Sequence, residues 1–233
     1  MKVKTIKQEL GKLANQTQAK ILQRFFKTGP GQYGAGDKFL GIKVPQQRAI
    51  AKKYYQTVAL SEITDLIKSP YHEHRLTGLI ILVMKFPQAT EIGQKQIFDF
   101  YLKNTKRINN WDLVDLTTPN IVGTWLLTHE RKILYQLAKS KLLWDRRIAI
   151  LTTFTFIRAK QFNDAIKISE MLLTDKHDLI HKAIGWMLRE IGKRDKKELI
   201  KFLEKNYAKM PRTMLRYAIE KLPKKQRKYY LNK

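Results

Sequence analysis

Cysteine is absent from the 233 residues of this chain. Without thiolates the chain cannot form disulfides, zinc–cysteine sites or iron–sulfur clusters. Glycine and proline are also scarce, with 11 and 7 residues, so few positions interrupt regular secondary structure. The longest apolar stretch, around residues 76–84, is far shorter than the roughly 20 residues that span a bilayer. Residues 1–8 lack an apolar core, so we expect no secretory signal and no membrane anchor.

Acidic side chains are much scarcer than basic ones. The chain has 20 Asp and Glu against 46 Lys and Arg, a formal net charge of +26, and a hydrophobic fraction of 43% that indicates a folded protein. The basic residues are spread through the predicted helices instead of forming a tail, which favours a nucleic-acid partner. A basic proteome or an anionic membrane surface is the alternative explanation. We expect a cytoplasmic, nucleoid-associated protein.

Apolar residues recur at helical spacing along almost the whole chain, which predicts an all-α fold. Basic residues open three of these apolar helices, and their separations fit a period of roughly 35 to 40 residues, typical of a helical solenoid with a concave face. Basic helix starts on that face would cradle a duplex by its phosphates. The helix starts are Arg75, Arg147 and Lys182; the apolar stripes are Leu10, Leu13, Ile21, Leu22, Phe25 and Phe26, then Leu76, Leu79, Ile80, Val83 and Met84, then Ile148, Leu151 and Phe154, and finally Ile184, Met187, Leu188 and Ile191.

Two short motifs resemble ligand sites. Residues 29–34, Gly-Pro-Gly-Gln-Tyr-Gly, match the dinucleotide fingerprint, but they follow a helical stripe and not a strand. Gly31 and Gly36 have the spacing of a phosphate-binding loop, but Asp37 stands where that loop needs lysine. We interpret Gly29–Asp37 as a flexible loop between helices, with Tyr33 near a ligand or DNA. His177 and His181 have the spacing of a metal pair, yet no third ligand is evident. We expect surface or capping histidines, and no metal or cofactor.

An acidic and aromatic island, Trp-Asp-Leu-Val-Asp, lies at residues 111–115. Trp111 and Asp115 share a helix face, whereas Asp112 points elsewhere and is expected to be an N-terminal cap or a partner for a nearby base. Lys182, Trp186 and Arg189 share another face. A tryptophan in a helical repeat is more often core than site. Equivalent positions of a solenoid nevertheless lie side by side, so the carboxylate, both indoles and the cations are expected around one groove.

Four segments resemble the AlkD-like DNA alkylation repair glycosylases, and the resemblance covers nearly the whole chain. They are Asn-Trp-Asp-Leu-Val-Asp at 110–115, Trp-Asp-Arg-Arg-Ile-Ala-Ile-Leu at 144–151, Lys-Ala-Ile-Gly-Trp-Met-Leu-Arg-Glu at 182–190, and Phe-Leu-Gly-Ile-Lys-Val-Pro at 39–45 with Arg48 shortly after. The resemblance implies a single HEAT-like domain over residues 1–233. It also implies a glycosylase for N3- and N7-alkylated purines that acts without base flipping. Asp115 would be the catalytic carboxylate, beside Arg147, with Trp111 and Trp186 at the lesion nucleotide.

The residues fit that chemistry. An N3- or N7-alkylated purine is already cationic, so it leaves without a general acid. Asp115 would stabilise the cationic sugar and orient water, and the indoles would add cation–π attraction of about 0.5–2 kcal/mol each. The cations expected to hold phosphates of duplex DNA around an alkylated purine are Arg48, Arg147, Lys182 and Arg189. We expect a monomer. A non-catalytic DNA- or RNA-binding module and a scaffold for an acidic protein remain the alternatives.

Overall fold

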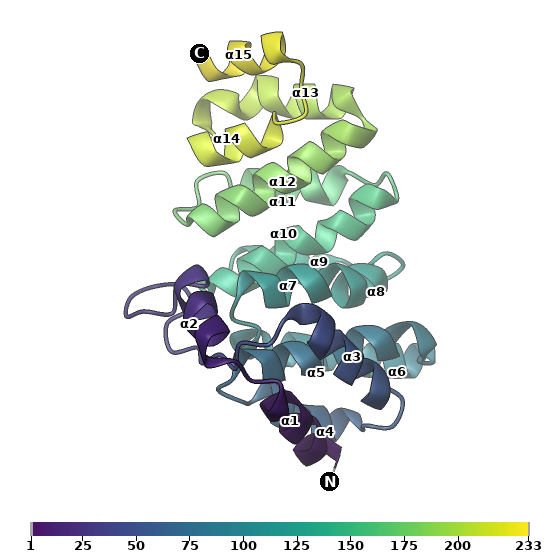
Figure 1. Ribbon diagram of the computed structural model, residues 1–233. Coiled ribbons are helices and arrows are strands. Elements are labelled where there is room, and N and C mark those ends of the chain that lie inside the picture. Colours follow the sequence, from purple (N-terminus) through teal and green to yellow (C-terminus); the bar gives the residue numbers. More distant parts are fainter. Residues whose placement is uncertain (1, 233) are drawn as a thin grey trace. The chain divides into compact units, whose positions relative to one another are not determined.

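The computed structural model describes residues 2–232. These residues form helices and connecting turns (Figure 1). The only β-type pairing among them is an isolated parallel bridge between Lys38 and Tyr71. The all-α prediction is confirmed. The chain divides into two compact units, residues 1–121 and 122–233. Within the described part of the chain, no helix has both the length and the apolar character needed to cross a membrane.

The first unit is built around α5. This helix packs against α3, α4 and α7, and every one of its residues from His72 to Leu82 is buried. Burial is expected for the mainly apolar residues 76–82, whereas the four titratable residues 72–75 are buried as well. The helices of the unit are α1 (Lys2–Lys12), α2 (Gln16–Phe25), α3 (Val44–Tyr54), α4 (Leu60–Ile67), α5 (His72–Lys85), α6 (Glu91–Lys103) and α7 (Trp111–Thr118), with short turns η1 (Phe86–Gln88) and η2 (Thr105–Arg107). The π-helical turn η3 (Pro119–Gly123) follows α7.

The second unit stacks helices in successive pairs. Helix α10 packs against α9, α11 and α12, and α12 packs in turn against α13 and α14 (Figure 1). This is the helical-repeat arrangement that the sequence period predicts. The helices are α8 (Thr124–Leu126), α9 (Lys132–Ala138), α10 (Leu143–Arg158), α11 (Asn163–Met171), α12 (Asp178–Arg194), α13 (Lys196–Asn206), α14 (Arg212–Ala218) and α15 (Lys224–Asn232), with the turn η4 (Tyr207–Lys209) after α13.

Ion pairs join side chains about one repeat apart in each unit. Arg75 donates to Asp37 across 38 residues at 2.6 Å. In the second unit Arg131 donates to Asp164 across 33 residues at 2.8 Å, and Arg146 to Asp175 across 29 residues at 2.6 Å. We call these contacts the inter-repeat ion pairs. They join helices and loops about one repeat apart in the chain, and a solenoid makes its contacts between neighbouring repeats.

The N-terminal apolar stripe, which was predicted to lie on one helix face, is only partly buried. Leu10 and Phe26 are buried, but Leu13, Ile21 and Phe25 are 37%, 55% and 61% exposed. The stripe is interrupted because Asn15 starts a second helix: its side-chain oxygen accepts from the Gln18 amide at 2.9 Å. This break changes the helical register, and α2 buries none of its residues.

Gly41 lies where two backbone segments of the first unit approach closely. Its φ is +84°, and a Cβ there would lie 2.1 Å from the Asn15 carbonyl oxygen and 2.7 Å from the Ala19 amide nitrogen. We expect Gly41→Ala to lower the free energy of unfolding by about 2 kcal/mol or more, measured by urea denaturation. Gly11→Ala is the matched control, since a Cβ there meets nothing within 4 Å. Equal losses in both variants would show that the close approach does not matter.

Candidate functional site

The candidate residues are divided between the two units. Arg48, Trp111 and Asp115 belong to the first, and Arg147, Lys182, Trp186 and Arg189 belong to the second. Arg48 is exposed on α3. Their convergence on one basic groove stays a prediction, and so does the single domain over residues 1–233.

Helix α7 presents the acidic and aromatic island. The helix begins at Trp111, whose amide donates to the side-chain oxygen of Asn110 at 2.8 Å. Trp111 and Asp115 are both half-buried, one turn apart on the same face, whereas Asp112 is buried. The carboxylate and the indole therefore share a partly solvent-accessible face, as their spacing predicts.

Tyr101 of α6 anchors the last turn of α7, which follows Asp115. Its buried hydroxyl forms hydrogen bonds with the hydroxyls of Thr117 and Thr118, at 2.8 and 2.7 Å. Burial raises the pKa of Tyr101, and the negative charge of Asp115 raises it further, while the two threonines act in the opposite direction. Tyr101 thus remains a neutral phenol, and its bonds fix the last turn of α7 against α6.

The indole of Trp111 is held by aromatic side chains. Its Nε1 donates to the Tyr33 hydroxyl at 3.3 Å, and its ring centroid lies 5.2 Å from that of Phe26 and 5.8 Å from that of Phe25. Tyr33 belongs to the Gly29–Asp37 loop. The Gly34 amide of this loop donates to the Lys27 carbonyl at 3.1 Å. The loop is therefore anchored, in contrast to the flexible connection expected from its composition.

A buried ionic cluster lies behind the Trp111 face. His72 Nε2 lies 2.8 Å from Asp112 Oδ2, and His72 Nδ1 lies 3.2 Å from Asp37 Oδ2. Arg75 donates to the other Asp37 oxygen at 2.6 Å. Burial by itself lowers the pKa of His72, but the two carboxylates outweigh it and raise that pKa to about 9. The prediction that Asp112 is structural is confirmed, as the partner of a base: it bonds His72 at 2.8 Å and accepts from the Leu113 amide at 2.8 Å, whereas the N-cap of α7 is Asn110.

Sequence reasoning missed His72 and Asp37 as parts of this cluster. It also placed Arg75 at a phosphate-binding helix start, which is wrong, because Arg75 is 3% exposed and donates to Asp37 and to the Ser69 carbonyl. The available signal was the run His-Glu-His-Arg at 72–75, since titratable groups opening an apolar helix need buried partners. Glu73, also buried, accepts from the backbone amides of residues 40–42.

In the second unit, α12 carries a matching aromatic and basic face. Lys182, Trp186 and Arg189 are all half-buried along it. The Trp186 ring packs against Phe154 of α10 with centroids 5.6 Å apart. Lys182 pairs with Asp178 at 2.7 Å, and Arg189 pairs with Glu220. Both cations therefore have carboxylate partners in the structure.

Arg147 is buried where α10 meets the start of α12. Its guanidinium donates to the Leu179 carbonyl, and the side chain is 5% exposed. His177 caps α12 by accepting from the Leu179 amide at 3.1 Å, so the prediction of a capping histidine is confirmed there. His181 bonds the Asp175 carbonyl. Over residues 2–232, no group of three His, Asp or Glu side chains is arranged to hold a metal ion.

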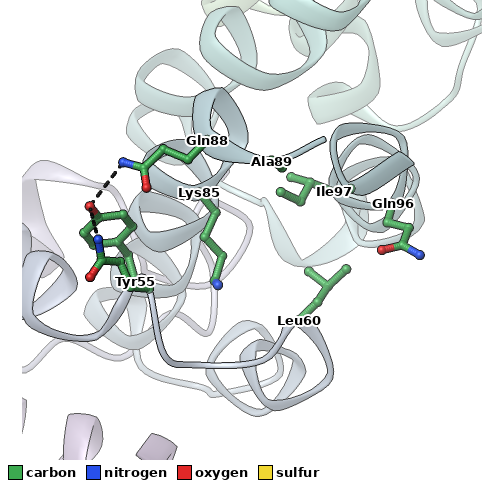
Figure 2. Close-up of a pocket in the computed structure, with 9 residues that line it drawn as sticks. Tyr55, Leu60, Lys85, Gln88, Ala89, Gln96 and Ile97 are labelled. Atoms are coloured by element: carbon green, nitrogen blue, oxygen red, sulfur yellow. Dashed lines mark hydrogen bonds between the residues drawn. The ribbon is translucent and has the colours of Figure 1, made fainter. Parts of the chain in front are cut away.

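A cavity of about 320 Å³ lies in the first unit between the ends of α3 and α5 and the starts of α4 and α6. Figure 2 shows the Tyr55 hydroxyl accepting from the Gln88 amide at 3.1 Å, with the Lys85 side chain extending between Tyr55 and Leu60. Burial lowers the pKa of Lys85. None of the nine residues that line the cavity is acidic, so its lining has no carboxylate with which to stabilise a cation, unlike the α7 face.

Two comparisons with known proteins point to the same family description. Residues 6–222 match the family described as DNA alkylation repair enzyme. A solved structure described as a predicted DNA alkylation repair enzyme from Enterococcus faecalis is 18% identical to this chain, with a TM-score of 0.72. The match covers 91% of this chain and 97% of that one, and it shows a common fold. A comparison with curated proteins gave no match.

Proposed function

The chain belongs to the DNA alkylation repair enzyme family, and on that premise we propose that it is a DNA glycosylase. It hydrolyses the N-glycosidic bond of N3- and N7-alkylated purines in duplex DNA and starts base excision repair without flipping the base. The observation that carries this proposal is the α7 face, where half-buried Asp115 stands one turn from half-buried Trp111. In a chain of net charge +26, a carboxylate on a DNA-facing surface needs a cationic partner.

The reaction supplies that cation. Cleavage of the bond leaves its electron pair on the alkylated purine, which departs neutral, and positive charge develops on the sugar. The Asp115 carboxylate stabilises this charge and orients a water molecule toward C1′; the water then loses a proton and leaves an abasic site. The indole faces of Trp111 and Trp186 contact the cationic sugar. No protonation of the leaving base is required.

The remaining candidate cations hold the DNA backbone. Arg48, Lys182 and Arg189 neutralise flanking phosphates and position the duplex without reading its sequence. Arg147 is buried and donates to the Leu179 carbonyl, so it holds the first turn of α12, the helix that carries Lys182 and Arg189. Lys182 and Arg189 exchange their partners, Asp178 and Glu220, for phosphate oxygens. The affinity for DNA therefore falls steeply as salt is added.

The test is release of base from a duplex that carries one N7-methylguanine. We expect the protein to release N7-methylguanine well above the spontaneous rate, measured by chromatography of the free base under single-turnover conditions. The control is the same duplex with guanine at that position, from which no base should be released. An absence of release from the methylated duplex would contradict the proposal.

Binding measurements separate the alternatives. Tight, salt-sensitive binding to duplex DNA without base release would identify a non-catalytic helical-repeat binder that uses the same cations. Affinity for duplex DNA that is weak and insensitive to salt would instead favour a scaffold for an acidic protein partner.

A further inference from the structure

The Gly29–Asp37 loop and the first turn of α7 are bridged by one side chain. His72, at the start of α5, lies 3.2 Å from the Asp37 carboxylate at the end of the loop and 2.8 Å from the Asp112 carboxylate of α7. Asp112 directly follows Trp111. The same loop contributes Tyr33, whose hydroxyl accepts from the Trp111 indole. Both members of the Tyr33–Trp111 hydrogen bond are therefore tethered to the His72 ring.

The imidazole is also fixed by stacking. Its ring stacks against Phe39, with centroids 4.5 Å apart, and against Phe26, with centroids 5.2 Å apart. Phe26 lies in turn 5.2 Å from the Trp111 ring. His72 is 2% exposed. A ring that is packed in this way and bonded at both nitrogens holds its two carboxylate partners at a set separation.

We propose that His72 is a positioning residue for the glycosylase reaction: by bonding Asp37 and Asp112 at once, it keeps Tyr33 against Trp111 and so orients the indole on the face that carries Asp115. This role rests on the proposed function for its catalytic consequence. His72 touches neither DNA nor the reacting atoms in the mechanism proposed above.

The bridge requires a protonated ring. A neutral imidazole has one N–H and donates one hydrogen bond, whereas the imidazolium donates from both nitrogens. Two carboxylates face the ring, Asp37 from the loop and Asp112 from α7, and one cation, Arg75 of α5, also acts on it. Loss of the His72 proton therefore breaks one side of the bridge and frees either the loop or the first turn of α7.

The direct test follows the Trp111 ring by fluorine NMR. The chain has 4 tryptophans; they are replaced by 5-fluorotryptophan, and the Trp111 signal is assigned with Trp111→Phe. We expect this signal to shift with a midpoint near pH 9, where His72 loses its proton. The Trp144 signal, from a buried ring of the second unit, should not follow that midpoint. A Trp111 signal without this midpoint would overturn the proposal. The pH titration itself is carried out on the fluorinated wild-type chain, and Trp111→Phe serves only for the assignment.

The variant His72→Gln adds a readout in the reaction. At neutral pH it is expected to slow single-turnover excision of N7-methylguanine by about 10-fold or more, with little change in DNA affinity. It should also abolish the midpoint of the Trp111 signal. His74→Gln is the control, because buried His74 bonds Ser69 at 2.8 Å, whereas the side-chain hydrogen bonds of Asp37 and Asp112 are with His72, Arg75 and Asn109. Its excision rate and Trp111 midpoint should match the wild type.

Two outcomes separate this proposal from the proposed function. If the wild-type protein releases no base but the Trp111 signal titrates with His72, the glycosylase assignment fails and the bridge stands. If the wild type releases base and His72→Gln does so at the same rate, the positioning role is wrong and the glycosylase assignment stands.

Discussion

Asp115→Asn is expected to slow the excision of N7-methylguanine by a factor on the order of 10²–10³, because the amide keeps the shape of the side chain and loses the charge that stabilises the cationic sugar. Affinity for DNA should persist or rise slightly, since one negative charge is removed from a surface that binds phosphates. The measurement is the single-turnover rate of base release at saturating protein, together with the dissociation constant at several salt concentrations.

The control for this variant is Asp99→Asn. Asp99 lies on α6 of the same unit, is exposed, and pairs with Lys95 at 2.6 Å. Its neutralisation changes the net charge by the same amount without touching the α7 face, so its excision rate should equal that of the wild type. Excision by Asp115→Asn at the wild-type rate would remove Asp115 from the mechanism.

Alkaline pH is expected to destabilise the first unit through His72. Its pKa is raised from 6.5 to about 9 in the folded protein. The stabilisation is complete below the unfolded pKa of 6.5, declines as pH rises from there, and is lost above about 9. The difference between the two pKa values corresponds to roughly 3 kcal/mol in the free energy of unfolding.

Urea denaturation at a series of pH values from about 6 to about 10 measures this loss. Other groups titrate above pH 9, so the informative quantity is the difference between the wild type and His72→Gln. The variant should be less stable at low pH and should approach the wild type as pH rises past 9. Two parallel curves would show that His72 does not hold its proton in the folded protein.

Helical periodicity predicted the parts of the fold that depend on near neighbours in sequence. The apolar stripes predicted helices that the structure contains as α5, α10 and α12. The N-terminal stripe was misread because one asparagine, Asn15, starts a new helix inside it. A capping side chain outweighed a continuous apolar pattern, since it satisfies an amide that the first turn leaves without a partner.

Helical spacing also explains which parts of the candidate site could be predicted. Trp111 and Asp115 were paired correctly because both lie on one helix, and Asp112 was assigned a structural role for the same reason. Its partner could not be predicted: His72 is 40 residues earlier in the chain, and Asp37 lies 35 residues before His72. Spacing rules concern residues three or four apart, so contacts one repeat away require the structure.

The inter-repeat ion pairs bear on how the chain is made. In each of the three pairs, a charge meets its partner within roughly one repeat: Asp37 with Arg75, Arg131 with Asp164, and Arg146 with Asp175. During translation, the first-synthesised member of each pair therefore gains its partner after only a few tens of further residues have been added. Folding can proceed from the N-terminus repeat by repeat during translation. A nascent chain that stops before Asp112 leaves His72 with Asp37 alone, so α7 is the segment whose emergence completes the first unit.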